Sequence, residues 1–107
     1  MNVSLGGLEE TILLIALVMD GEAYAVSIAK AYKERSGKSI SIPAVHTVMK
    51  RLEKKGMLTS SMGGATDERG GRTKRLYEVT KYGYHTLNEL RHFREGLWKE
   101  APGFRFT

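Results

Sequence analysis

The side chains in this sequence that could do chemistry are mostly cationic, and they gather in one stretch. Residues 50–75 hold eight lysines and arginines and three acidic residues, and this excess, 8 − 3 = 5, equals the net charge of +5 of all 107 residues. A solvated polar face usually mixes both signs of charge. One-sided positive charge instead favours a polyanion, such as nucleic acid or an acidic membrane surface.

Few other residues have the types and spacing of a catalytic or metal site. His85, Glu89 and His92 share a helical face, but the two histidines would lie about 10 Å apart along it, too far to bind one ion together. Residues 63–71 lack the Gly-Lys-Ser/Thr ending of a phosphate-binding loop. The chain has no cysteine and no serine in a nucleophile motif. We therefore expect no enzyme, no metal and no cofactor.

Length and composition indicate one small globular domain. The chain has 107 residues, 41% of them hydrophobic and 27% charged, which suits a single core. The longest apolar run, residues 11–19, is too short to cross a membrane and follows two glutamates, where a signal peptide would have basic residues. We expect a cytoplasmic protein with no membrane contact. Without disulfides, a domain of this size often gains stability from a partner chain.

Four helices and one hairpin must position the cations. Apolar spacing and turn residues predict helices over residues 8–19, 24–36 and 80–99, and a third helix that begins after Ser41 and ends at Gly56. Residues 39–42 suit a short extended segment. Residues 57–62 and 73–80 suit the strands of a hairpin, whose turn carries glycines that allow a positive φ: Gly63, Gly64, Gly70 and Gly71. The predicted fold is mainly α with a small β-hairpin.

The third helix should present one polar face. Its apolar residues form a narrow stripe, and the opposite face carries Pro43, Thr47, Lys50 and Lys54, flanked by His46 and Arg51. A helix-turn-helix followed by a basic, glycine-bracketed hairpin is the winged-helix plan, in which this helix enters the DNA major groove and the hairpin contacts the backbone. The other interpretation of the hairpin is a solvated loop without a partner.

Four segments of the sequence, in order, resemble the PadR family of bacterial transcriptional regulators over nearly the whole chain. They are LEETILLIAL, YAVSI, SIPAVHTVMKRLEKKGML and GGRTKRLYEVTKYG, of which residues 51–58 and 70–83 are the most specific. The resemblance implies a winged helix-turn-helix plus a C-terminal dimerisation helix. We accordingly expect one domain over residues 1–107, with the DNA-binding core and wing over 8–79 and the dimerisation helix over 80–100.

Two positions depart from the family pattern. His46 stands where the family usually has a tyrosine associated with DNA contact, and Ala25 stands where it often has glycine. A neutral histidine could replace the hydrogen bond of that tyrosine, or it could simply pack. Both interpretations of His46 stay open on the sequence alone.

The leading hypothesis is a sequence-specific regulator, a repressor by resemblance, that binds an inverted repeat in double-stranded DNA as a homodimer. Base edges would face Pro43, Ala44, Thr47 and Lys50, and phosphates would face Arg51, Lys54, Arg69, Arg72 and Lys74. The complete set expected at DNA adds two residues at and near the start of the third helix, Ser41 and His46.

The terminal helix carries more large apolar residues than a small core can cover, so a partner chain should bury them. The residues expected at the dimer interface are Leu8, Ile12, Tyr84, Leu87, Leu90, Phe93 and Leu97. Dimers of some similar regulators bind flat aromatic molecules between terminal helices, so Phe93 and Trp98 could bind a small planar aromatic effector. Simple dimer packing explains the same two residues.

Two rival functions can be distinguished from this hypothesis. A winged-helix module could use its basic hairpin to dock an acidic partner protein, and weak, sequence-blind DNA binding would favour that function. A small-molecule sensor could act chiefly through the dimer cleft. Quenching of Trp98 fluorescence by planar compounds would support the sensor.

Overall fold

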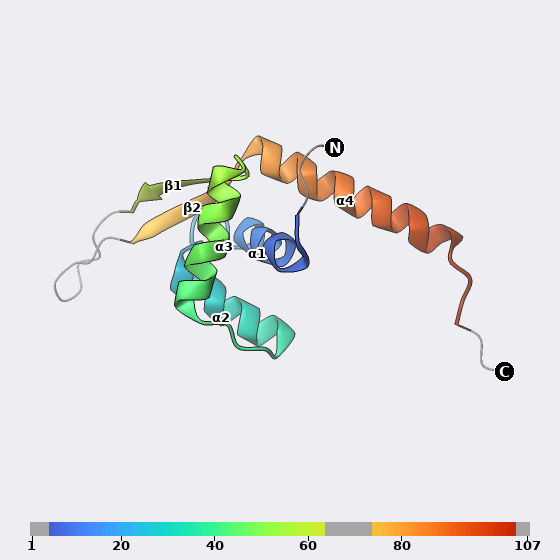
Figure 1. Ribbon diagram of the computed structural model, residues 1–107, viewed down its shortest axis with the longest axis horizontal. Coiled ribbons are helices and arrows are strands. Elements are labelled where there is room, and N and C mark those ends of the chain that lie inside the picture. The colour runs from blue at the N-terminus through green and yellow to red at the C-terminus, as the bar shows by residue number, and fades with distance from the viewer. Residues whose placement is uncertain (1–4, 64–73, 105–107) are drawn as a thin grey trace.

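The computed structural model describes residues 5–63 and 74–104. Within these ranges the chain forms four helices and a two-stranded antiparallel hairpin (Figure 1). In chain order the elements are α1 (Gly7–Val18), α2 (Ala25–Ser36), α3 (Ile42–Lys54), β1 (Leu58–Met62), β2 (Arg75–Val79) and α4 (Lys81–Glu100). The mainly α fold with a small β-hairpin that the sequence predicts is confirmed.

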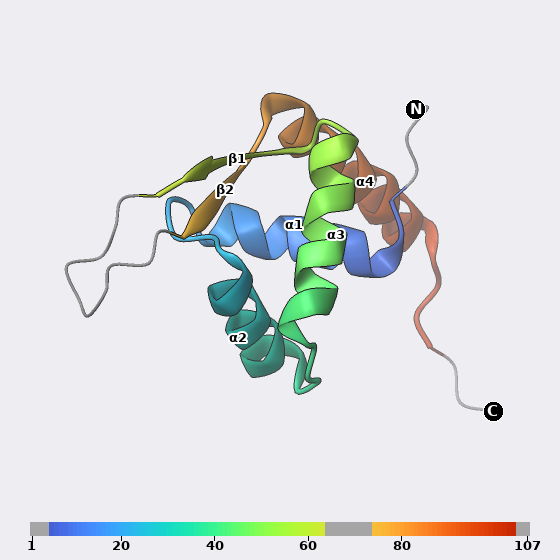
Figure 2. The same ribbon diagram turned by 60° about the vertical axis from the view of Figure 1, so that its left-hand side comes forward.

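Helix α1 lies at the centre of the core and contacts α2, α3, α4 and β2 (Figure 2). Because its residues are apolar nearly all round, it can bury side chains against neighbours on several sides at once. Ile12 and Leu13 of α1 are fully buried, as are Ile28 of α2 and Leu52 of α3. Burial of each such side chain stabilises the fold by about 1.5–3 kcal/mol, so these contacts fix how α3 lies on the rest of the chain.

Helix α3 has well-defined ends, which fix the part of the chain that it can present. At its start the Ser41 hydroxyl accepts a hydrogen bond from the Ala44 N–H at 3.2 Å, and Pro43 occupies the first turn, where its missing N–H is not needed. After its end, Gly56 adopts a positive φ of 80° that most residues avoid. The prediction of Ser41 as the N-cap is confirmed.

The extended segment predicted over residues 39–42 is wrong as a strand. Ile42 already begins α3, and the extended backbone of Ser41, with φ −74° and ψ 151°, is the conformation that a helix N-cap requires. The third extended partner of the hairpin comes from a different place in the chain. Ala23 accepts a hydrogen bond from the Tyr77 N–H at 2.8 Å and forms an isolated bridge with β2.

The hairpin of β1 and β2 is the wing, and its register decides which residues face α3. Leu58 pairs with Val79, Ser60 with Tyr77, and Met62 with Arg75. Tyr77 is 1% exposed, whereas its neighbour Glu78 is on the exposed face. Tyr77 and Glu78 therefore point to opposite faces of β2.

Of the four turn glycines, Gly63 alone lies in the described part of the chain, and its φ is not positive. A Cβ at Gly63 would lie 2.8 Å from Cδ1 of Leu76 and 3.1 Å from the Lys74 carbonyl oxygen, so a larger residue there would have to displace its neighbours. The expectation that this glycine turns the chain with a positive φ is wrong. Gly64, Gly70 and Gly71 lie outside the described residues.

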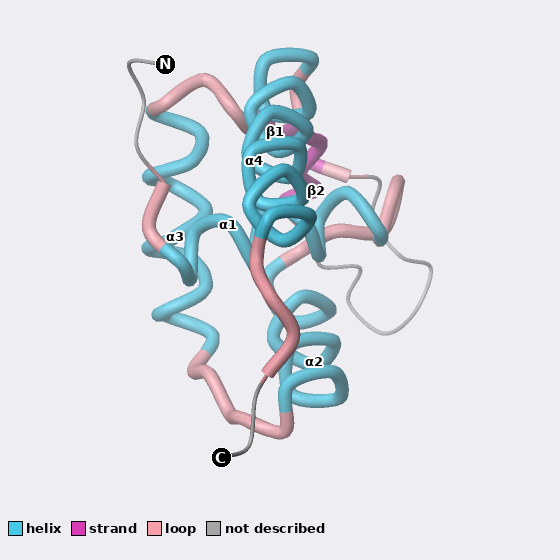
Figure 3. The backbone as a smooth tube through the Cα atoms, turned by 90° about the vertical axis from the view of Figure 1, so that its right-hand side faces the viewer, coloured by secondary structure: helices cyan, strands magenta, loops and turns pink. Residues whose placement is uncertain are grey.

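Helix α4 is fixed at its root and then extends past the core; Figure 3 looks along it. The Thr80 hydroxyl caps the helix by accepting from the Gly83 N–H at 3.0 Å, and it donates to the Gly56 carbonyl at 2.7 Å. Gly83 is buried, and a Cβ there would lie 2.4 Å from the Met57 carbonyl oxygen. Only glycine permits this approach, which ties the start of α4 to the turn that follows α3.

Candidate nucleic-acid interface

The outward face of α3 is open to solvent in the described part of the chain. Its inward stripe of Val45, Val48, Met49 and Leu52 is buried in the core. Of the residues on or next to α3 that are expected at DNA, Ala44 is half-buried. The others are exposed: Ser41, Pro43, His46, Thr47, Lys50, Arg51 and Lys54. The polar face predicted from helical spacing therefore exists as a surface.

Three polar residues on or next to α3 differ in whether their side chains already make hydrogen bonds within the protein. The Ser41 hydroxyl accepts the capping hydrogen bond, and the Thr47 hydroxyl donates to the Pro43 carbonyl at 3.0 Å. Thr47 can still accept a hydrogen bond from a ligand without breaking that contact. His46 is exposed, so its side chain does not fill the core.

A groove runs between α3 and the wing, with a volume of about 440 Å³. We call it the α3–β2 groove, and the residues that line it are Lys50, Glu53, Lys54, Arg75 and Tyr77. It brings together two cations predicted to contact DNA, Lys50 and Lys54, with a third cation on β2, Arg75.

The side chain of Arg75 is held in place by two residues. Its guanidinium donates to the Ser60 hydroxyl at 3.0 Å, and that hydroxyl donates to the Glu53 carboxylate at 2.7 Å. Arg75 was not among the residues expected at DNA from the sequence. Its spacing of two residues from Tyr77 on β2 is the signal that could have found it, because both residues line the groove beside α3.

The other wing cations are placed differently. Lys74 is exposed, and its ammonium lies 4.2 Å from the ring centroid of Tyr24 at the start of α2, so it is not grouped with Lys50 and Lys54. This cation–π contact orients Lys74 beside the helix-turn-helix. Arg69 and Arg72, which were expected to face phosphates, lie outside the described residues.

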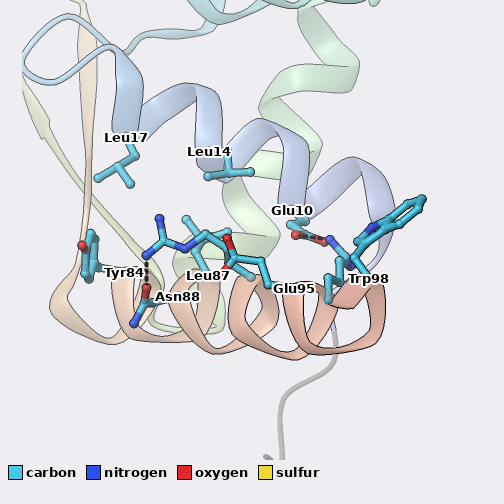
Figure 4. A pocket seen from close by; sticks show the side chains of 10 residues that line it. Glu10, Leu14, Leu17, Tyr84, Leu87, Asn88, Glu95 and Trp98 are labelled. Carbon is cyan, nitrogen blue, oxygen red and sulfur yellow. Dashed lines mark hydrogen bonds and ion pairs between the residues drawn. The ribbon is translucent and has the colours of Figure 1, made fainter. Parts of the chain in front are cut away.

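A second surface is formed by α1 and α4, where a cavity of about 290 Å³ opens between the two helices (Figure 4). Figure 4 shows Leu14 and Leu17 of α1 facing α4, with Tyr84 and Trp98 at opposite ends of the cavity. The glutamate and arginine that join the two helices, Glu10 and Arg94, form an ion pair beside it. We call this surface the α1–α4 face.

The residues of α1 and α4 expected at a dimer interface divide into exposed and buried ones. Leu8, Tyr84, Phe93 and Leu97 are exposed, and Leu90 is half-buried. Ile12 is 0% exposed and Leu87 is 5% exposed, because both side chains pack into the core of their own chain. We therefore leave both Ile12 and Leu87 out of the interface proposed below. Leu14, which is 43% exposed, is an addition to the set.

The predicted aromatic pair lies near the far end of α4. Phe93 is 66% exposed and Trp98 is 77% exposed, and Trp98 lines the α1–α4 cavity. Within the described residues, no group of three histidine or acidic side chains could hold a metal ion. No helix in that part of the chain is long and apolar enough to cross a membrane.

A three-helix core, a two-stranded wing and an open cationic face on the third helix define the winged-helix class of DNA-binding proteins. Residues 13–89 of the chain match the family model described as "Transcriptional regulator PadR-like family". This match covers more than half of the chain, which therefore belongs to that family of transcriptional regulators. Such regulators act by binding DNA and are not enzymes. No curated protein matches the chain.

Solved structures with the same fold include three PadR-type regulators. A PadR-like transcription factor from Bacteroides fragilis is 23% identical, with 87% of this chain and 84% of that chain covered and a TM-score of 0.70. A PadR family regulator from Clostridium difficile is 22% identical, with 84% and 91% covered and a TM-score of 0.65. A PadR-like regulator from Bacillus cereus is 18% identical, with 87% and 85% covered and a TM-score of 0.69. At these identities the likeness establishes the winged-helix fold.

Proposed function

We propose that this PadR-family regulator represses transcription in the cytoplasm by binding an inverted repeat in double-stranded DNA as a homodimer. The observation that supports the proposal best is the open face of α3, where Lys50 and Lys54 stand beside the wing with no described element covering them. A helix of this kind fits the major groove of B-DNA, where base edges carry sequence information.

The residues of α3 divide between two roles in this proposal. Pro43, Ala44, Thr47 and Lys50 face base edges, while His46 and Ser41 lie at the edge of the contact. Arg51, Lys54 and Lys74 neutralise phosphates together with Arg69 and Arg72. Phosphate contacts fix the register of the protein on the duplex, and base contacts select the sequence.

Selection of duplexes from a random pool by the full-length protein tests this function. We expect an enriched inverted repeat whose half-site centres lie about one helical turn or a multiple of it apart. Affinity for the selected duplex should fall steeply between two salt concentrations, because phosphate contacts release condensed counterions. Weak, sequence-blind binding combined with tight binding to an acidic protein would instead favour a protein-docking module.

The α1–α4 face is the proposed dimer interface. Several large apolar side chains are exposed on these two contacting helices: Leu8, Leu14, Tyr84, Phe93 and Leu97. A two-fold axis at this face would bury these side chains in both chains and place two copies of α3 on one duplex.

A small planar aromatic effector is the proposed ligand of this interface. Trp98 lines the α1–α4 cavity and is largely exposed in the single chain, so a flat ring could stack on it. Planar aromatic compounds should quench tryptophan fluorescence, because Trp98 is the one tryptophan in the sequence. An unchanged emission spectrum across a panel of such compounds would remove the effector from the proposal.

A further inference from the structure

Core packing holds only the first part of α4. The buried residues of this helix, Gly83, Thr86 and Leu87, all lie in its first two turns. The side chains of residues 91–95 and 97–100, in the second half of the helix, are all exposed. The direction of that second half therefore depends on few contacts with the rest of the chain.

One ion pair joins the second half of α4 to the core. The Arg94 guanidinium donates to the Glu10 carboxylate of α1 (Figure 4). The Glu10 side chain is 11% exposed, and its neighbours in α1, Ile12 and Leu13, are fully buried, so the carboxylate has a fixed place. Within the described residues, Arg94 is the one side-chain partner of Glu10. Because a nearly buried carboxylate without a partner is costly, the ion pair should stay closed.

The space beside the ion pair leaves the angle between the two helices open. The α1–α4 cavity of about 290 Å³ is lined by Leu14 and Leu17 of α1 and by Trp98 of α4, among others. Interdigitated side chains fix the angle between two packed helices, and a cavity between them removes part of that constraint. Two points then define the direction of α4: its tight contact at Gly83 and the ion pair of Arg94, about 16 Å farther along the helix.

We propose that the ion pair of Glu10 and Arg94 sets the direction of α4 relative to the core, and thereby the half-site spacing that the dimer accepts. The second part rests on the proposed function, in which the partner chain binds along α4. Each α3 belongs to the core of its own chain, so a change in the direction of α4 moves the two copies of α3 relative to each other. Glu10 and Arg94 are positioning residues in this proposal, because neither touches DNA.

The Arg94→Met variant tests the effect on DNA, because it keeps an unbranched side chain and removes the guanidinium. Its binding is measured on inverted repeats at the selected spacing and at spacings one base pair longer or shorter. The preference for the selected spacing should fall about 2- to 30-fold, the usual range for coupling between two elements, while affinity for a single half-site stays the same. Arg94→Lys can still pair with Glu10 and should retain most of the preference.

Arg91→Met is the matched control for the same experiment. Arg91 is exposed, lines the same cavity and lies one turn before Arg94. It donates to Asn88 of α4 itself, so its guanidinium does not join the two helices. This variant should keep the spacing preference of the wild type.

The direction of α4 can also be measured without DNA. The chain has no cysteine, so Lys30→Cys on α2 and Glu100→Cys at the end of α4 provide two unique sites for spin labels. Pulsed electron paramagnetic resonance gives the distance between the labels within one chain when labelled protein is diluted with excess unlabelled protein. We expect a narrow distance distribution in the labelled wild type and in Arg91→Met, and a broader or shifted one in both Arg94→Met and Glu10→Gln.

The two measurements separate this proposal from the proposed function. Unchanged label distances in both Arg94→Met and Glu10→Gln would overturn the role of the ion pair, whatever the protein binds. Changed distances with an unchanged spacing preference would overturn the link to DNA spacing while the proposed function stands. A wild type that binds no duplex would overturn the proposed function and the link to DNA spacing, and the label distances would still decide whether the ion pair sets the direction of α4.

Discussion

At the scale of single residues, the face of α3 separates side chains that build the helix from side chains left for a ligand. The Ser41 hydroxyl caps the helix and the Thr47 hydroxyl donates to Pro43, so both already make contacts within the protein. Lys50 is exposed and makes no ion pair within the described residues. A long, unpaired cation at this point can reach the O6 and N7 acceptors of guanine.

Lys50→Ala should therefore weaken binding mainly at the selected sequence. We expect a loss of about 1–3 kcal/mol on that duplex and a much smaller loss on random DNA, if one base contact is removed. Fluorescence anisotropy with both duplexes at one salt concentration measures the difference. Equal losses on the two duplexes would assign Lys50 to a phosphate instead of a base.

At the scale of elements, the sequence predicted each helix and the hairpin but missed features that depend on distant segments. Apolar spacing located the helices, because each buries one stripe against the core. Apolar spacing could not show whether Ile12 faces the core or a partner chain, because α1 is apolar nearly all round. The contact among Arg75, Ser60 and Glu53 depends on the register of β1 with β2 and on how the wing packs against α3. Local patterns carry no information on either arrangement.

The root of α4 depends on one glycine. Gly83→Ala would place a Cβ 2.4 Å from the Met57 carbonyl oxygen, so the backbone must shift. We expect a loss of about 1–3 kcal/mol in the free energy of unfolding, measured by chemical denaturation. Gly96→Ala, in the same helix, meets no atom within 4 Å and should gain about 0.5–1 kcal/mol from helix propensity. Equal stability of the two variants would contradict the close contact at Gly83.

The start of α1 is joined to the end of α3 by an ion pair that depends on pH. Glu9 accepts from the Lys55 ammonium at 2.8 Å and from the Gly6 N–H at 2.9 Å, and the hydrogen bond from Lys55 is the main cause of a lowered pKa at Glu9. Because the folded pKa lies below the ordinary value of 4.5, this stabilisation is present above about pH 4.5 and is lost as the pH falls through the folded pKa.

Glu9→Gln should consequently lower the free energy of unfolding at neutral pH by about 0.5–1 kcal/mol, the usual range for a partly exposed pair. At about pH 3 the variant and the wild type should differ less, because the carboxylate of the wild type is increasingly protonated there. Urea denaturation at the two pH values measures this. Glu34→Gln, at an exposed glutamate of α2, is the control and should show little difference from the wild type at either pH.

At the scale of the whole molecule, the surfaces proposed for DNA recognition and for self-association are separate. The α3–β2 groove is lined by residues of α3 and the wing, and the α1–α4 cavity is lined by residues of α1 and α4. The wing and α4 extend from the core in opposite directions (Figure 1). A change on one surface should therefore leave the local chemistry of the other intact. In the proposed dimer, both surfaces are needed to place two copies of α3 on one duplex.

Leu97→Asp should convert the proposed dimer into a monomer, because it places a charge at an exposed apolar position of α4 that the partner chain is proposed to bury. Analytical ultracentrifugation measures the assembly state, and we expect affinity for the inverted repeat to fall about 100-fold or more while affinity for a single half-site changes little. Val26→Asp, at an apolar residue of α2 that is 52% exposed, is the matched control and should remain a dimer. A Leu97→Asp protein that still sediments as a dimer would place the interface elsewhere.

The close contact between Gly83 and Met57 holds the start of α4 against the core, so a tilt of α4 would pivot at that point. The twenty residues of α4 span about 30 Å, so a tilt of about 5° moves the far end of the helix by about 3 Å. In the proposed dimer both arms would tilt together. A movement of this size in each arm would then change the spacing of the two α3 helices on the scale of the rise of one base pair, which is about 3.4 Å along a strand.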